Sequence, residues 1–90
     1  MSDKIRVGIV MGSDSDLAIM QKCADQLSAF GLACEMRIIS AHRTPQLAHE
    51  YAATAVDRGL KVIIAAAGMS AALAGVMAAN TTMPVIGVPI

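Results

Sequence analysis

Four apolar runs rich in β-branched residues alternate with three segments of helical periodicity, and this alternation constrains the fold more than any other feature. The runs predict strands over residues 5–11, 33–39, 61–66 and 84–88, and the periodic segments predict helices over 16–30, 46–58 and 70–80. Strands that alternate with single helices build a parallel sheet with right-handed crossovers. Runs as continuously apolar as VIIA and PVIGV indicate a sheet covered on both faces. We therefore predict one α/β domain over residues 1–90, a three-layer sandwich of the flavodoxin-like or Rossmann-like kind with the order β-α-β-α-β-α-β.

Two of the predicted helices are amphipathic, with an apolar stripe that should face the sheet. The stripe residues are Leu17, Met20, Ala24 and Leu27 in the first helix and Leu47, Tyr51 and Ala55 in the second. Gly31 and Gly59 follow these helices, as expected of glycines that end a helix in the left-handed conformation. The segment 70–80 is apolar on every side, which indicates a helix buried between layers or between subunits.

Composition argues against several classes of protein. Seven basic residues balance seven acidic ones, no basic run is present, and the aromatic residues are one Tyr and one Phe. Nucleic-acid binders usually carry a basic stripe and aromatic stacking platforms, so we expect no nucleic-acid partner. Cys23 and Cys34 fit neither a metal-ligand spacing nor a redox pair, which predicts two buried free thiols in a reducing cytoplasm. With 56% hydrophobic residues in so short a chain, we expect a homo-oligomer.

The stretch 62–90 carries no charged residue and is long enough to suggest a transmembrane segment. It begins with β-branched residues, contains Gly68 and Ser70, becomes rich in alanine and then reaches polar residues and Pro84. A strand, a turn and a buried helix explain this pattern better than one membrane span. The first ten residues have charges but no apolar core followed by a cleavage site, so we predict no signal peptide. We expect a soluble cytoplasmic protein with no membrane partner.

The segments that follow the predicted strands hold most of the residues capable of chemistry. In a sheet of this kind, ligands bind outside the carboxyl ends of the strands. The segments there are GSDSD at 12–16, SAHRTP at 40–45, AGMS at 67–70 and GVP at 87–89. They bring small hydroxyl groups, one arginine and one histidine to a single rim. We predict that this rim is the functional site.

The GSDSD turn has two compatible interpretations. Gly12 makes the tight turn, and Asp14 or Ser15 caps the helix that begins near Asp16. The free N–H groups and hydroxyls at such a helix start can also bind an anion such as a phosphate. The turn lacks the Gly-Lys-Ser/Thr ending of a P-loop and the spacing of GxGxxG, so neither a nucleoside triphosphate nor NAD is indicated.

The SAHRTP segment carries the stronger signal. His42 and Arg43 directly follow an apolar strand and precede Thr44 and Pro45, a plausible cap and first-turn proline. Arg43 can hold a phosphate or carboxylate through its fork of N–H donors, and His42 can give and take protons near neutral pH. The alternative is that His42 only caps the loop or bonds one of its carbonyl groups. His49 falls on the polar face of the second helix and is predicted as a solvated surface histidine.

In this order and spacing, VGIVMGSDSDLAIM, SAHRTP, KVIIAAAG and NTTMPVIGVP resemble the N5-carboxyaminoimidazole ribonucleotide mutases, over essentially all of residues 5–90. The resemblance implies an enzyme of purine biosynthesis. Such an enzyme moves a carboxyl group of a phosphorylated imidazole ribonucleotide from the exocyclic nitrogen to a ring carbon, without ATP, metal or organic cofactor. It also implies a homo-octamer, which would account for the apolar third helix.

The resemblance further implies that Ser13, Asp16 and Arg43 bind the substrate and that His42 is the general acid/base. The other rim residues predicted to bind substrate are Gly12, Ser15, Ser40, Ala41 and Gly68. No cluster of His, Cys and carboxylates has metal-ligand spacing, so we predict no metal.

The sequence departs from the family pattern in one loop. Where the family has GAGGAAHLPG, residues 66–75 read AAGMSAALAG, so Ala72 replaces a second family histidine and Ala74 a proline. The related aminoimidazole ribonucleotide carboxylases, which take up free CO2, also lack that histidine. SAHRTP favours a mutase, and the altered loop leaves such a carboxylase open as an alternative.

The family pattern continues past residue 90 with more strand and helix, so we expect residues 1–90 to be an incomplete domain. An inactive fragment with a structural or nucleotide-binding role is therefore a further alternative. A flavodoxin-like receiver is disfavoured because no lysine follows Lys61, and a flavin protein because Phe30 and Tyr51 are the only aromatic residues.

Overall fold

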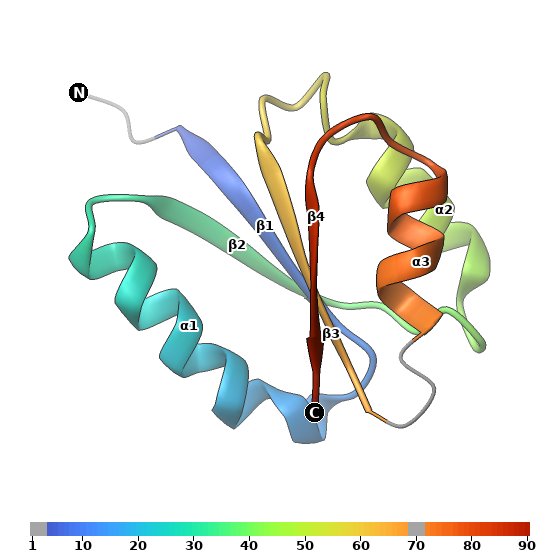
Figure 1. Cartoon of the computed structure of the whole chain (residues 1–90), viewed down its shortest axis with the longest axis horizontal. Helices are drawn as coiled ribbons and strands as arrows, with labels where there is room; N and C mark the ends of the chain where they lie inside the picture. The colour runs from blue at the N-terminus through green and yellow to red at the C-terminus, as the bar shows by residue number, and fades with distance from the viewer. Residues whose placement is uncertain (1–3, 69–71) are drawn as a thin grey trace.

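The computed structural model describes residues 4–68 and 72–90, which form a parallel four-stranded sheet between helices (Figure 1). The strands run in the order β2-β1-β3-β4, the arrangement of a flavodoxin-like sheet. The predicted α/β fold and element order are confirmed. The strands are β1 (Ile5–Met11), β2 (Ala33–Ile38), β3 (Val62–Ala67) and β4 (Val85–Pro89). The helices are α1 (Leu17–Ala29), α2 (Pro45–Thr54) and α3 (Ala72–Ala79), and a 3-10 turn at Asp14–Asp16 precedes α1.

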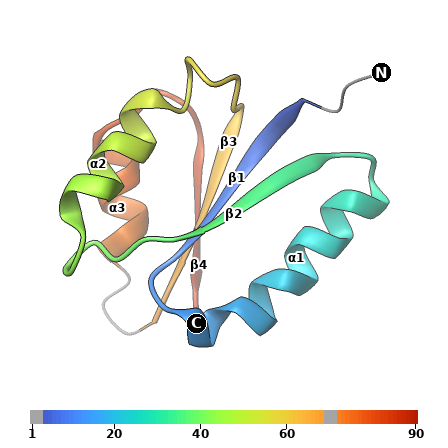
Figure 2. The ribbon, with the colours of Figure 1, turned by 180° about the vertical axis from the view of Figure 1, so that it is seen from behind.

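Helices cover both faces of the sheet: α1 lies on one face, and α2 and α3 lie on the other (Figures 1 and 2). The side chains of the central strands alternate between these layers, as the pleat of a strand requires. From β1, Ile9 packs toward α1, whereas Val10 packs toward α2 and α3. From β3, Ile64 packs toward α1 and Ile63 toward the other two helices. The prediction of a sheet covered on both faces is confirmed for these central strands.

The apolar stripes of the helices differ from the prediction at two residues. Met20 and Ala24 of α1 are buried, but Leu17 is 40% exposed. In α2 the predicted stripe residue Leu47 is 52% exposed. The other two predicted stripe residues, Tyr51 and Ala55, are buried as expected, and Ala48 and Ala52 join them on the sheet-facing side.

The predicted helix ends are partly correct. Gly31 and Gly59 both have positive φ, of 81° and 89°. However, α2 ends at Thr54 and not at Arg58, because residues 55–59 form tighter turns before Gly59 reverses the chain. Strand ends shift by a single residue, which is the usual uncertainty at an element boundary.

The third helix is buried on one side only. Leu73 and Met77 of α3 are buried, whereas Gly75, Ala78 and Ala79 are exposed. Burial between the layers of this chain is therefore confirmed for one side of the helix only, and burial between subunits stays a prediction. Its predicted start at Ser70 lies outside the described residues. Within residues 4–68 and 72–90, no helix is long and apolar enough to cross a membrane.

The two cysteines and His49 also differ in detail from the prediction. Cys23 of α1 and Cys34 of β2 are free but half-buried, and both pack against the core between α1 and the sheet. Burial raises the pKa of the Cys34 thiol, and the nearby Cys23 and Asp25 raise it further. His49 is exposed, as predicted, yet its Nδ1 lies 2.7 Å from Oδ1 of Asn80, so it links α2 to the end of α3.

Candidate active site

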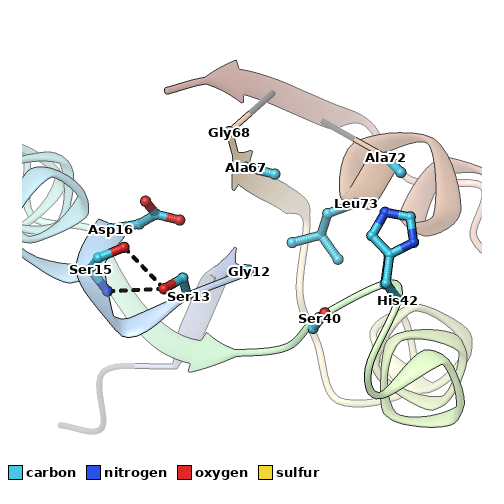
Figure 3. A pocket seen from close by; sticks show the side chains of 11 residues that line it. Gly12, Ser13, Ser15, Asp16, Ser40, His42, Ala67, Gly68, Ala72 and Leu73 are labelled. Carbon is cyan, nitrogen blue, oxygen red and sulfur yellow. Dashed lines mark hydrogen bonds between the residues drawn. The ribbon is translucent and has the colours of Figure 1, made fainter. Parts of the chain in front are cut away.

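A cleft of about 370 Å³ lies at the carboxyl ends of β1, β2 and β3 (Figure 3). Segments that are distant in the sequence meet there because parallel strands end at the same edge of a sheet. The lining residues are Gly12, Ser13, Ser15, Asp16, Ser40, Ala41, His42, Ala67, Gly68, Ala72 and Leu73. All the predicted site residues except Arg43 line this cleft.

The GSDSD turn forms one wall of the cleft. Ser13 is the N-cap of the 3-10 turn, and its Oγ accepts the N–H of Ser15 at 3.2 Å. The Oγ atoms of Ser13 and Ser15 lie 3.0 Å apart. The prediction that Asp14 or Ser15 caps the helix is therefore wrong. Ser13 caps the 3-10 turn that precedes α1, because its backbone is still extended, with φ −150° and ψ 150°, where a side chain can reach forward to the next turn.

Asp16 is the N-cap residue of α1, but its side chain makes no capping hydrogen bond. The side chain is half-buried, and Figure 3 shows its carboxylate directed toward the cleft. A carboxylate with both oxygens free of the helix can accept hydrogen bonds from the hydroxyl groups of a ligand. Asp16 therefore brings an acceptor to the site, next to the backbone N–H groups of the same turn.

His42 lies on a short turn between β2 and α2, across the cleft from the GSDSD wall (Figure 3). Its side chain is exposed, and it is among the residues that line the cleft. The imidazole therefore lies at the cleft and not among packed apolar side chains. Ile39, which is buried, anchors the start of the turn because its N–H donates to the Met11 carbonyl oxygen at 2.8 Å.

Arg43 lies outside the cleft. It lines a neighbouring hollow of about 270 Å³ together with Gly12, Ser40 and Thr44. The two spaces share Gly12 and Ser40, so the hollow that Arg43 lines adjoins the cleft. Thr44 and Pro45 are the N-cap and first-turn proline of α2, as predicted, although the Thr44 side chain makes no capping bond.

The third wall comes from the end of β3 and the start of α3. Gly68 lines it as predicted, and Ala67, Ala72 and Leu73 join it. Ala67 belongs to the predicted rim segment, whereas Leu73 was not predicted at the site, because an apolar side chain there gives the same pattern as a core residue. Met69 and Ser70, also placed at this rim by the sequence, lie outside the described residues. Among those that are described, no group of three or more His, Cys, Asp and Glu side chains could hold a metal ion.

The model of the AIR carboxylase family matches residues 6–90. The chain belongs to the AIR carboxylase family. Similar members include N5-carboxyaminoimidazole ribonucleotide mutases of Pyrococcus abyssi, 60% identical over 94% of this chain, and Pyrococcus horikoshii, 57% identical over 99% of it. These matches cover 49% and 50% of the respective relatives, so the chain spans about half the length of the curated AIR carboxylase family members it matches.

Solved structures of the family share the fold. The crystal structure of Treponema denticola PurE superimposes with a TM-score of 0.80 at 36% sequence identity, covering 93% of this chain and 54% of that one. A variant of Treponema denticola PurE2 gives a TM-score of 0.83 at 34% identity, covering 97% of this chain and 55% of the other. The resemblance inferred from the sequence motifs is thus confirmed for the family and for its flavodoxin-like α/β fold.

Proposed function

We propose that this chain carries the substrate-binding edge of an N5-carboxyaminoimidazole ribonucleotide mutase and converts that ribonucleotide to its 4-carboxy isomer in purine biosynthesis. The observation that carries the proposal is the cleft itself, where the GSDSD turn and His42 line one space from opposite sides. The names of the similar proteins, all with this activity, support the same assignment.

The binding roles follow from the chemistry of the walls. The substrate phosphate would bind the hydroxyls of Ser13 and Ser15 at the start of the helix, because a helix start favours anions. Asp16 would accept hydrogen bonds from ribose hydroxyls, since a carboxylate there would repel a phosphate. Arg43 would add positive charge from the neighbouring hollow. The remaining contacts would be short ones from Gly12, Ser40, Ala41 and Gly68.

The reaction needs one proton carrier and no cofactor. Protonated His42 would give its proton to the exocyclic nitrogen, so that the bond from nitrogen to the carboxyl carbon breaks and CO2 is released as a neutral molecule. The ring carbon would then attack CO2 to form the new carbon–carbon bond, and neutral His42 would remove the proton from that carbon. The imidazole ends protonated, as it began. Because the cleft holds CO2 beside the ring, the second step gains from proximity.

The proposal is tested by measuring turnover and substrate affinity in a His42 variant and in a control variant. His42→Asn should reduce kcat by roughly 100- to 10,000-fold, the usual contribution of a placed proton carrier. Substrate affinity, measured by calorimetry, should change little, because the phosphate and ribose contacts remain. His49→Asn is the matched control, since His49 is exposed on α2 and outside the cleft. Turnover retained by His42→Asn would remove that residue from the reaction.

One observation favours a second candidate function, an aminoimidazole ribonucleotide carboxylase that uses free CO2. Ala72, which replaces the second histidine of the mutase pattern, lines the cleft directly. A methyl group there cannot exchange protons or hydrogen-bond to a carboxyl group. Direct assays separate the two functions: a mutase turns over the N-carboxylated ribonucleotide without added bicarbonate, whereas a carboxylase requires aminoimidazole ribonucleotide and CO2. If neither substrate binds, the chain has only a structural role.

The assembly and the compartment belong to the same proposal. We place the enzyme in the cytoplasm as a homo-oligomer, an octamer by its resemblance to the family. Exposed apolar side chains support association between copies, because burying them in a contact would remove apolar surface from water. Phe30, Leu47 and Ile86 are each more than half exposed.

A further inference from the structure

The turn that carries His42 is closed by its own hydrogen bonds, and the Thr44 hydroxyl makes two of them. Thr44 Oγ1 accepts the N–H of Ser40 at 3.0 Å and donates to the Ser40 carbonyl oxygen at 3.0 Å. The Thr44 N–H donates to the same carbonyl oxygen at 2.9 Å. The residues between the joined positions are Ala41, His42 and Arg43, and the N–H of Arg43 donates to Ser40 Oγ at 3.0 Å.

The Thr44 side chain serves this turn and not the helix that it precedes. A threonine at an N-cap usually accepts a hydrogen bond from a free N–H group of the first helical turn, which stabilises the helix. Thr44 occupies the N-cap of α2 and makes no such bond. Its hydroxyl is half-buried and points back to Ser40. A helix-capping role therefore does not explain this hydroxyl.

Both ends of the turn are attached to rigid parts of the fold. On one side Ile39 is 6% exposed, and its N–H bonds to the Met11 carbonyl oxygen of β1. On the other side Ala48 of α2 is fully buried, and its N–H donates to the Thr44 carbonyl oxygen at 3.2 Å. The bonds between Ser40 and Thr44 join these two bodies directly. The backbone of the turn that carries His42 is thus attached to the sheet at one end and to α2 at the other.

We propose that Thr44 is a positioning residue, whose hydroxyl closes the 40–44 turn so that His42 is presented to the cleft. This inference rests on the proposed proton-transfer role of His42. Without the hydroxyl, the Ser40 N–H loses its acceptor and the turn gains alternative conformations. A displacement of about 1 Å in a reacting group can reduce a rate on the order of 100-fold.

The test compares Thr44→Val with Thr44→Ser. Valine keeps the shape of threonine and lacks the hydroxyl, so we expect kcat to fall on the order of 100-fold. KM should change little, because the phosphate- and ribose-binding wall is untouched. Serine restores the hydroxyl, and Thr44→Ser should recover most of the wild-type kcat. If Thr44→Ser had both a lower kcat and a higher KM than the wild type, the proposal would be overturned.

Thr54→Val is the matched control. The Thr54 hydroxyl also donates to a carbonyl oxygen four residues earlier, that of Glu50, at 2.7 Å. It lies in the same helix but at the end remote from the cleft, and it does not line the site. Thr54→Val should therefore leave kcat unchanged. An equal loss of kcat in both valine variants would show general destabilisation of α2 and would overturn the positioning role.

Amide hydrogen exchange tests the turn without reference to activity. In Thr44→Val, the amides of Ser40 and Thr44 should exchange faster than in the wild type, whereas those of β3 should not change. Unchanged protection would overturn the inference whether or not the chain is active. Lost protection with unchanged kcat would overturn it as well. If the wild type turned over no substrate while Thr44→Val still lost protection at Ser40 and Thr44, that pair of results would support closure of the turn by the Thr44 hydroxyl and would count against the proposed function alone.

Discussion

Gly8 and Tyr51 show how a single missing side chain makes room for a hydrogen-bond network. The Tyr51 hydroxyl donates to Glu35 Oε2 at 2.6 Å, and Arg58 Nη1 donates to the same oxygen at 2.9 Å. The guanidinium of Arg58 lies 4.7 Å from the centre of the Tyr51 ring. A Cβ atom at Gly8 would collide with the Tyr51 hydroxyl. Gly8 is therefore required for close approach, and the network joins β2 to α2 far from the cleft.

The collision leads to a prediction for Gly8→Ala. Overpacking of a filled core costs about 1–3 kcal/mol of unfolding free energy, and we expect a loss in this range. Tyr51→Phe removes the colliding oxygen, so the double variant should be less destabilised than the sum of the single changes. Urea unfolding of the wild type, the two single variants and the double variant measures the coupling free energy between positions 8 and 51. Additive losses would show that the Tyr51 hydroxyl does not restrict this position.

Glu35 should make stability depend on pH in the acid range. Burial alone would raise the pKa of Glu35, but hydrogen bonds from Tyr51 and Arg58 and the charges of Arg58 and Arg37 hold this pKa below its ordinary value. The stabilisation is fully present above the unfolded pKa of about 4.3 and is lost as the pH falls through the lower folded value. The unfolding free energy of the wild type should therefore fall between about pH 5 and pH 3.

Glu35→Gln should flatten this dependence, because the amide does not titrate. It should also lower the unfolding free energy at neutral pH, since Arg58 loses its charged partner. Urea unfolding at several pH values measures both effects. Glu50→Gln is the control, as Glu50 is exposed on α2. A Glu35→Gln variant that loses as much stability as the wild type over this pH range would exclude Glu35 as the cause.

Among the secondary-structure elements, the helices are positioned by their ends as much as by their faces. The chain leaves α1 and α2 through Gly31 and Gly59, both in the left-handed region that other residues rarely adopt. After α2, the Leu60 N–H donates to the Ala55 carbonyl oxygen at 3.0 Å, which closes the reversal. These exits set where β2 and β3 begin, and so where their carboxyl ends meet.

Replacing Gly59 and Gly75 by alanine should have opposite effects on the unfolding free energy. Gly59→Ala forces a Cβ into a φ of 89°, and we expect a loss of about 1 kcal/mol or more. Gly75 lies within α3, is exposed, and has open space where the methyl group of an alanine would lie, so Gly75→Ala should gain about 0.5–1 kcal/mol through helix propensity. Thermal unfolding of the two variants provides the comparison. If the unfolding temperatures of the two variants shifted in the same direction, this account of the two glycines would be contradicted.

At the scale of the whole molecule, the helices cover the two faces of the sheet unequally. α1 alone covers one face of the sheet and lies toward β2, so β4 is less protected on that side (Figure 1). Ile64 and Ile86 are register partners and point to the same face, yet Ile64 is 8% exposed and Ile86 is 52% exposed. In the described residues β4 has one neighbouring strand, β3. Such an apolar edge tends to pair with another chain.

We therefore expect the chain to sediment as an oligomer whose stability depends on β4. Ile86→Lys places a charge on the uncovered apolar surface and should shift the distribution toward smaller species in analytical ultracentrifugation. Val56→Lys is the control, because Val56 is 55% exposed in the turn after α2 and away from the sheet edge. A wild-type chain that is monomeric at all concentrations would contradict the expectation.

Much of this architecture follows from local patterns. The alternation of apolar runs and helical segments predicted the order of elements, and glycines marked the chain reversals that follow α1 and α2. The strand-end position of GSDSD and SAHRTP predicted a shared rim, because the carboxyl ends of parallel strands meet at one edge. These inferences succeeded because periodicity and turn chemistry depend on neighbours in the chain.

Other features depend on which distant residues meet, and local patterns do not contain that information. The exposure of Leu47, the use of Ser13 as the cap and the commitment of the Thr44 hydroxyl to Ser40 each depend on how closely an element approaches its neighbours. Arg43 adjoins His42 in sequence, yet it lies in a separate hollow because the turn sends successive side chains in different directions. A side chain's contacts follow from packing over the whole chain, whereas its place in a helix or strand follows largely from its neighbours.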